Sequence, residues 1–308
     1  MKFNPAIATL KFVACTGVVW IHYGVGGSRL TMFCVPLFMF LAVFLSSKTI
    51  WKGDVLDLRK RVRRILVPYV LWSGVCWLVF GVIKGKLSLS RLAWQIIFGH
   101  CVCKPLYFMW ILAVTTMLLF YIYKCRTRYW ILGFLCLGSF ILQYLGLHVH
   151  MLDACPSEAK YTLGRFIELF PIAVTGLAFA VAYERGSVGF YVCMMLLIGL
   201  VLTAGVKGLG LHVFPPGFGY GGFLMTLIPA SICIVAISAG RESPTWLSWT
   251  AILGKLSVGV YLSHIFVGEV ILSVSSLQKG FLLSAMVFGG SCILTLGLIH
   301  TKLSKLVQ

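Results

Sequence analysis

The chain has 308 residues, of which 60% are hydrophobic and 11% charged, with 26 Lys and Arg residues against eight Asp and Glu. Soluble domains usually carry about 25% charged residues, so this composition excludes a water-soluble globular protein. It predicts a single integral membrane domain over residues 1–308 and leaves the net charge of +18 to be explained.

Long apolar stretches follow one another along the whole chain, and about 20 such residues cross a bilayer. They predict an all-α fold, a polytopic membrane bundle of about ten transmembrane helices. The expected spans lie near 6–24, 30–47, 65–83, 107–123, 129–147, 166–183, 188–206, 219–238, 253–272 and 280–300.

The first expected span carries two ionisable residues, Lys11 and His22. Eleven positions are close to three helical turns, so both side chains face one way, with a rise of about 16 Å between them. This register predicts a polar line across the membrane. The alternatives are a lysine that reaches the lipid headgroups and a histidine bonded to a backbone carbonyl at a helix end. No small-residue cleavage site follows, so the segment is expected to be retained as a span.

A basic cluster lies directly before the third expected span, where residues 61–69 read Arg-Val-Arg-Arg-Ile-Leu-Val-Pro-Tyr. Arginine binds carboxylate or phosphate through paired hydrogen bonds. The cluster therefore predicts an anion site at one mouth of the protein, with Arg61 and Arg64 as ligands. Farther on, residues 92–98 are apolar but too short to span, and we expect them to lie at the interface or to re-enter the bundle.

The basic residues also predict the orientation, because Lys and Arg are retained on the cytoplasmic side. With the N-terminus inside, the inner segments hold fifteen Lys and Arg and the outer segments nine. Both termini are thus expected in the cytoplasm, in the inner (plasma) membrane of the cell. Most of the positive charge is explained by this topology and by contact with membrane lipids, which argues against nucleic acid as a partner.

Polar residues in the later spans are further candidates, because burying them in lipid is costly unless they are paired. His264 follows Ser257 and Tyr261 on one helical face, a pattern that fits either a site or hydrogen bonds between helices. Glu168 and Glu269 are expected to pair with cations such as Lys11 or Arg165.

No metal site is predicted. The eleven cysteines are scattered, mostly inside apolar runs, and Cys101 and Cys103 lack a metal-binding spacing. His148, His150 and Asp153 could bind a metal at the outer surface, but a solvated loop is the favoured interpretation.

Four segments together resemble the type-3 membrane acyltransferase family. Residues 10–22 are similar to that family's first span, in which an arginine precedes a histidine by eleven positions. Residues 61–69 match its Arg-x-x-Arg element followed by Pro-Tyr, and 257–264 its late Ser-x-x-x-Tyr-Leu-x-His span. Residues 35–44 resemble its aromatic second span, and 105–110, ending at Trp110, are a weaker match to the start of its fourth. The chain departs from the family at two points: Lys11 replaces the usual arginine, and Leu41-Ala42 the usual Ser-Gly.

The resemblance implies an O-acyltransferase that moves an acyl group, commonly acetyl, from cytoplasmic acyl-CoA to a hydroxyl of a surface or lipid-linked glycan. Acyl-CoA would be the donor substrate, with no permanently bound cofactor. Arg61 and Arg64 would hold the coenzyme A phosphates and His22 would be the general base. Lys11 would fix a donor carbonyl or phosphate, or hold the inner end of the path. The alternative is a non-enzymatic carrier or flippase for a lipid-linked sugar or organic anion, with the same residues lining an anion path. The residues left between a site and a structural role are Tyr261, His264, Ser257, Glu168, Glu269 and Trp110.

Overall fold

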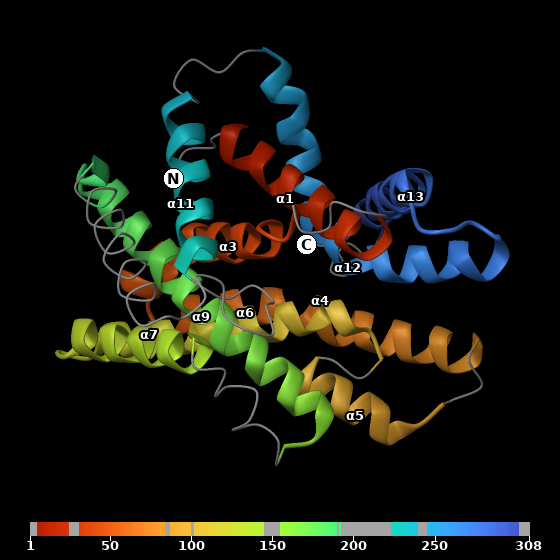
Figure 1. Cartoon of the computed structure of the whole chain (residues 1–308), viewed down its shortest axis with the longest axis horizontal. Helices are drawn as coiled ribbons and strands as arrows, with labels where there is room; N and C mark the ends of the chain where they lie inside the picture. The colour runs from red at the N-terminus through yellow and green to blue at the C-terminus, as the bar shows by residue number, and fades with distance from the viewer. Residues whose placement is uncertain are drawn as a thin grey trace. The chain divides into compact units, whose positions relative to one another are not determined.

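The computed structural model describes residues 5–24, 31–83, 87–99, 102–144, 155–189, 191, 223–239 and 245–301. Every regular element in these ranges is a helix, which confirms the all-α fold (Figure 1). The chain forms two compact units that interleave along the sequence. Unit 1 comprises Met1–Phe38, Arg64–Trp110 and Cys233–Gln308, and unit 2 comprises Met39–Arg63 and Ile111–Ile232.

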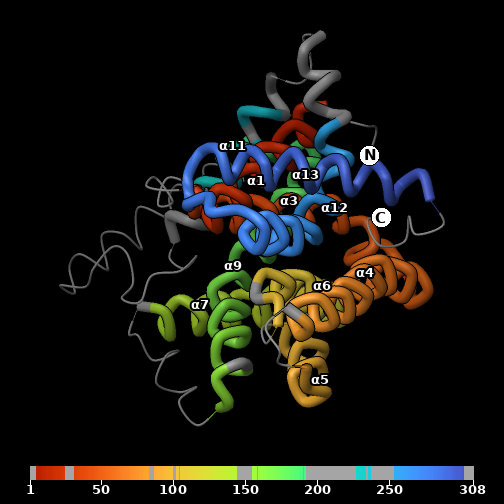
Figure 2. Tube along the Cα trace, turned by 90° about the vertical axis from the view of Figure 1, so that its right-hand side faces the viewer, coloured from red at the N-terminus to blue at the C-terminus, as the bar shows by residue number. Residues whose placement is uncertain are grey.

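Unit 1 is built around three packed helices, α1 (Pro5–Tyr23), α12 (Thr245–Val274) and α13 (Phe281–Ile299), which lie together in Figure 2. The helices α1 and α12 run in parallel: the Cys15 thiol donates to the Ser257 carbonyl (3.3 Å) and the Tyr23 hydroxyl to the Ile265 carbonyl (3.4 Å).

The third helix, α13, runs antiparallel to α1. Phe12 packs on Phe288 with ring centroids 5.5 Å apart, and Trp20 packs on Phe281 at 6.2 Å. These relative directions agree with the expected order, in which the first and ninth spans share a direction and the tenth returns.

Helix α4 (Val55–Ile83) begins ten residues before the expected span at 65. The cause is a helix cap: the Asp54 carboxylate accepts a hydrogen bond from the Asp57 backbone N–H (2.8 Å). The basic cluster, expected directly before the span, therefore lies within the helix itself, in its first turns.

Helix α5 (Leu89–Phe98) turns back along α4. The Trp77 indole donates to the Ser88 carbonyl (2.8 Å), and the Tyr69 hydroxyl reaches the carbonyls of Gln95 and, at 2.9 Å, Ile96. Residues 92–98 were expected either to lie at the membrane interface or to re-enter the bundle. The contacts with α4 favour the second of these. The short helix η1 (Lys104–Leu106) then leads into the next long helix.

Unit 2 is held by α6 (Tyr107–Lys124), α7 (Arg128–Tyr144), α9 (Ser157–Glu184) and most of α3 (Cys34–Trp51). In its core, the Phe179 ring lies 5.5 Å from each of the Phe40, Phe44 and Tyr191 rings. On α7, Ser139 and Gln143 donate to the Ile167 carbonyl of α9.

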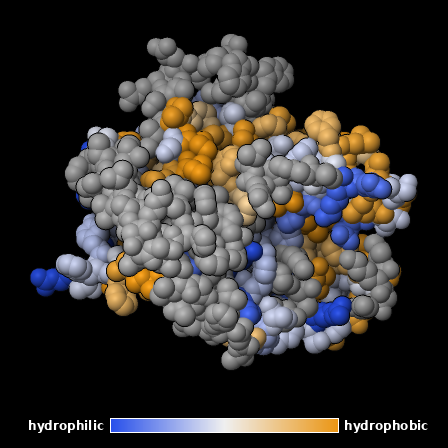
Figure 3. All heavy atoms as spheres, viewed as in Figure 1, coloured by the Kyte–Doolittle hydropathy of each residue, from blue (hydrophilic) through white to orange (hydrophobic). Residues whose placement is uncertain are grey.

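Seven helices among the residues that the structure describes are long and apolar enough to cross a membrane: α1, α3, α4, α6, α9, α12 and α13. Two shorter ones, α7 and α11 (Phe223–Ala239), coincide with expected spans at 129–147 and 219–238. The expected span at 188–206 lies almost wholly outside the described residues, so the number ten stays a prediction. Large apolar side chains such as Trp130 (84% exposed) and Val274 (81%) face outward, and apolar residues are visible at the surface in Figure 3. Such a surface suits contact with lipid.

Candidate active site

The close packing of α1 and α12 brings two histidines together in unit 1. The rings of His22 and His264 lie with centroids 5.4 Å apart, tilted by 38°. His264 is fully buried, whereas His22 is half-buried near the end of α1. The sequence predicted each imidazole separately, and the structure shows that they form a pair.

The protonation of the His264 ring follows from its hydrogen bond. Its Nδ1 lies 2.6 Å from the Tyr261 carbonyl oxygen, which can only accept, so Nδ1 carries the proton. The lone pair is then on Nε2, which is buried and has no hydrogen-bond partner among the described residues. A buried acceptor without a partner is uncommon in proteins and marks a position where a proton or ligand can be received.

Tyr261 connects this pair to the turn before α6. Its hydroxyl donates to the Pro105 carbonyl, and its ring stacks on Phe38 at 5.5 Å and lies 5.4 Å from Phe108. Tyr261 thereby links the turn at residues 104–106 to α12. Its ring also lies 5.7 Å from that of His264. Trp110, on the next turn of α6, is half-buried.

Ser257 has a structural role. Its hydroxyl donates to the Gly254 carbonyl (2.8 Å) one turn earlier on α12, and its own carbonyl accepts from Cys15. Ser257 thus takes part in the contact between α1 and α12, and whether it also has a role in a site is untested.

Lys11 lies on α1, half-buried, three turns before His22. The helix confirms the common register, since eleven residues advance about 16 Å along the axis. At that separation the lysine is not part of the histidine pair, so its catalytic role stays a prediction.

Arg61 and Arg64 lie one turn apart on α4, an i, i+3 spacing that places them on one face. Arg61 is half-buried and Arg64 exposed. Two arginines at this spacing on one helix are the residue type that binds phosphate through paired hydrogen bonds. Their role toward coenzyme A stays a prediction.

The structure gives an ion-pair partner for Glu168, one of the two carboxylates that were expected to pair with cations. Glu168 is buried on α9 and accepts a hydrogen bond from Arg165 at 2.6 Å, an ion pair of the kind expected for it. Glu269 is half-buried on α12 in unit 1.

Gln95, which the sequence analysis did not single out, and Tyr69 of the basic segment organise α5. The Gln95 side chain is buried, accepts from the backbone N–H groups of Val102 (2.7 Å) and Cys103 (3.0 Å), and donates to the Cys103 carbonyl (3.3 Å). Tyr69 binds the end of α5, so the Pro-Tyr part of the basic motif is a structural anchor. The sequence did contain a signal for this role, because Gln95 is a polar residue inside the otherwise apolar segment 92–98.

No group of three or more potential metal ligands occurs within the described ranges. Cys103 is buried, and the proposed alternative at His148, His150 and Asp153 lies outside those ranges.

Comparison with known proteins agrees with the sequence motifs. A family model described as an acyltransferase domain matches residues 4–300, nearly the full chain. No curated protein and no solved structure gives a significant match. With its long apolar helices, the chain is a multi-pass membrane protein, and it belongs to the acyltransferase 3 family of membrane acyltransferases.

Proposed function

We propose that this acyltransferase moves an acyl group, in the simplest case acetyl, from acyl-CoA to a hydroxyl of a surface or lipid-linked glycan. The observation that carries the proposal is the histidine pair of α1 and α12, in which His22 is partly accessible and His264 fully buried. A neutral imidazole can accept a proton from a reacting hydroxyl, which is otherwise a poor nucleophile.

His22 is the proposed general base. It takes the proton of the acceptor hydroxyl as the oxygen attacks the thioester carbonyl carbon. The tetrahedral intermediate collapses, the carbon–sulfur bond breaks, and the coenzyme A thiolate takes the proton from the imidazolium. The new ester and free coenzyme A leave, and His22 is neutral again.

Arg61 and Arg64 are the proposed ligands of the donor phosphates. Their placement on one face of α4 supports this assignment, since guanidinium groups bind phosphate through paired, charge-assisted hydrogen bonds.

Arg61→Lys should weaken donor use although the charge is kept. Loss of one such bond is worth about 1.5–3 kcal/mol, or roughly ten- to a hundredfold in donor affinity. The apparent KM for acetyl-CoA measures this, with Arg126→Lys, on an exposed loop, as the control. A donor KM that stays unchanged in both Arg61→Ala and Arg64→Ala would assign the cluster to topology or lipid contact.

The test of the function uses membranes that contain the full-length protein, incubated with acetyl-labelled acetyl-CoA. Stable label should appear on glycan, and His22→Gln should reduce it by about 10²–10⁴-fold. His300→Gln is the matched control, because His300 is exposed at the end of α13. Mass spectrometry of surface glycans from cells with and without the gene identifies the acceptor.

Two outcomes would contradict the proposal. Near wild-type transfer by His22→Gln would make His22 a structural histidine. Transport of a lipid-linked sugar without any label on glycan would support the carrier instead.

A further inference from the structure

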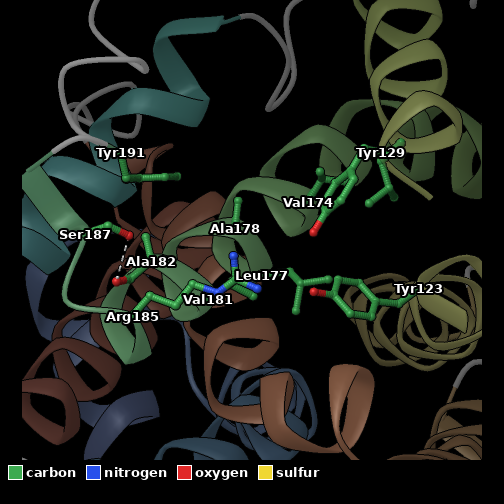
Figure 4. Close-up of a pocket in the computed structure, with 11 residues that line it drawn as sticks. Tyr123, Tyr129, Val174, Leu177, Ala178, Val181, Ala182, Arg185, Ser187 and Tyr191 are labelled. Carbon is green, nitrogen blue, oxygen red and sulfur yellow. Dashed lines mark hydrogen bonds between the residues drawn. The ribbon is translucent and has the colours of Figure 1, made fainter. Parts of the chain in front are cut away.

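Unit 2 contains a cavity that the proposed reaction does not use. It has a volume of about 350 Å³ and lies where α6 ends, α7 begins and α9 ends (Figure 4). This volume is at the lower end of the range for small-ligand sites. The walls are mainly aliphatic, formed by Leu132, Val174, Leu177, Ala178, Val181 and Ala182.

Polar groups converge on this cavity from three elements. In Figure 4 the Arg185 guanidinium and the hydroxyls of Tyr123 and Tyr129 point toward its centre. Arg128 contacts both tyrosines, with its guanidinium carbon 4.9 Å from the centre of the Tyr123 ring and 5.0 Å from that of Tyr129. The site therefore combines an apolar wall with a cationic, hydroxyl-rich side.

The same end of unit 2 carries an excess of positive charge. Lys52 forms an ion pair with Glu184 (2.8 Å), and Lys124 donates to the Gly53 carbonyl (2.9 Å), so the segments around 52, 124 and 185 meet there. All three were predicted to lie on the cytoplasmic side. Glu184, the acidic neighbour of Arg185, is already engaged by Lys52, which leaves the cavity's surroundings net positive.

We propose that this cavity binds an anionic membrane phospholipid, with part of an acyl chain against the aliphatic wall and the phosphate at Arg185 and the two tyrosine hydroxyls. Basic pockets between membrane helices on the cytoplasmic side are suited to anionic headgroups. A small inorganic anion would leave the aliphatic wall unused, and a neutral lipid would leave Arg185 without a counter-charge. This inference does not depend on the proposed acyl transfer.

The experiment compares lipid retention by the full-length protein after extraction from vesicles of phosphatidylcholine with and without phosphatidylglycerol, measured by native mass spectrometry. The wild type should retain phosphatidylglycerol in preference to phosphatidylcholine. Arg185→Gln should lower that retention about fivefold, the contribution expected of one cation near the membrane surface. Ala178→Trp, which fills the cavity and keeps every charge, should abolish it. Arg126→Gln, at an exposed position outside the cavity lining, should change nothing.

Equal retention of the two lipids by the wild type would overturn the proposal. Unchanged retention in Ala178→Trp would show that only surface charge attracts the lipid. Displacement of phosphatidylglycerol by inorganic phosphate or coenzyme A would assign the site to a water-soluble anion. If Ala178→Trp elutes as aggregate, the smaller filling in Ala178→Leu provides the same comparison.

Discussion

His264 illustrates how one side chain can have two separable functions. Its Nδ1–H holds the Tyr261 carbonyl, and its Nε2 lone pair is available near the His22 ring. The first function stabilises the helix, whereas the second bears on chemistry because the ring that carries this acceptor lies 5.4 Å, between centroids, from the ring of the proposed base. Substitutions that keep one nitrogen and lose the other can distinguish them.

His264→Asn places an amide N–H near Nδ1 and removes the group at Nε2. If His264 supports His22 through Nε2, this variant should fold as the wild type does and lose about a hundredfold in kcat, the lower end of the range for proton-transfer catalysis. Labelled acetyl transfer in membranes measures the rate, and elution as a single species after detergent extraction checks the fold. Full activity of His264→Asn would restrict His264 to its bond with Tyr261.

At the level of residues, the sequence predicted contacts within one helix better than contacts between helices. The i, i+3 spacing of Arg165 and Glu168 fixes their ion pair within one helix, and eleven-residue spacing fixes the register of Lys11 and His22. The contact between His22 and His264 joins positions 242 residues apart. No local spacing encodes such a contact, because it depends on how two helices pack.

Among the helices, the contact between α1 and α12 is the one that forms the histidine pair. It depends on close approach at Gly254, where an added Cβ would collide with the Ala8 backbone carbonyl oxygen. Small residues at helix interfaces allow such approach in membranes. The two helices can therefore approach this closely only because residue 254 is a glycine and has no Cβ.

Gly254→Ala should separate α1 from α12 and lower both stability and transfer activity. Overpacking typically costs about 1–3 kcal/mol, and a backbone oxygen cannot rotate away as a side chain can. The fraction of monodisperse protein left after heating in detergent measures stability. The control is Gly289→Ala on α13, since nothing lies within 4 Å of a Cβ placed there. Equal heat resistance of the two variants would contradict the close approach.

Helix positions were predicted well where hydropathy alone sets them and less well where polar contacts do. The bounds of α6 and α13 lie within a residue or two of the expected spans. In contrast, α4 begins at a cap formed by Asp54, and α5 is turned back by Gln95 and Tyr69. Hydropathy carries no information on single hydrogen bonds. The start of α4 could still have been predicted, because Asp54-x-x-Asp57 is a helix-start signal in the sequence.

For the whole molecule, the central question is which end faces the cytoplasm. Within unit 2, three of the segments predicted to be cytoplasmic meet at one end, through the Lys52–Glu184 ion pair and the Lys124–Gly53 hydrogen bond. Within unit 1, α1 and α12 run parallel and α13 returns. Each arrangement agrees with the expected order of the spans within its own unit. The orientation with the N-terminus in the cytoplasm stays a prediction.

This topology predicts that Cys125 faces the cytoplasm and residue 279 the opposite side. Cys125 is exposed in the turn between α6 and α7, and Lys279 is exposed between α12 and α13. In a background without the other cysteines, an impermeant thiol reagent applied to intact cells should spare Cys125 and label Lys279→Cys. After the membrane is opened, both should react, which shows that each thiol is accessible. Labelling of Cys125 but not of position 279 in intact cells would invert the topology. Arg61 and Arg64 would then face away from the cytoplasmic acyl-CoA pool, and the proposed donor site would have to be abandoned.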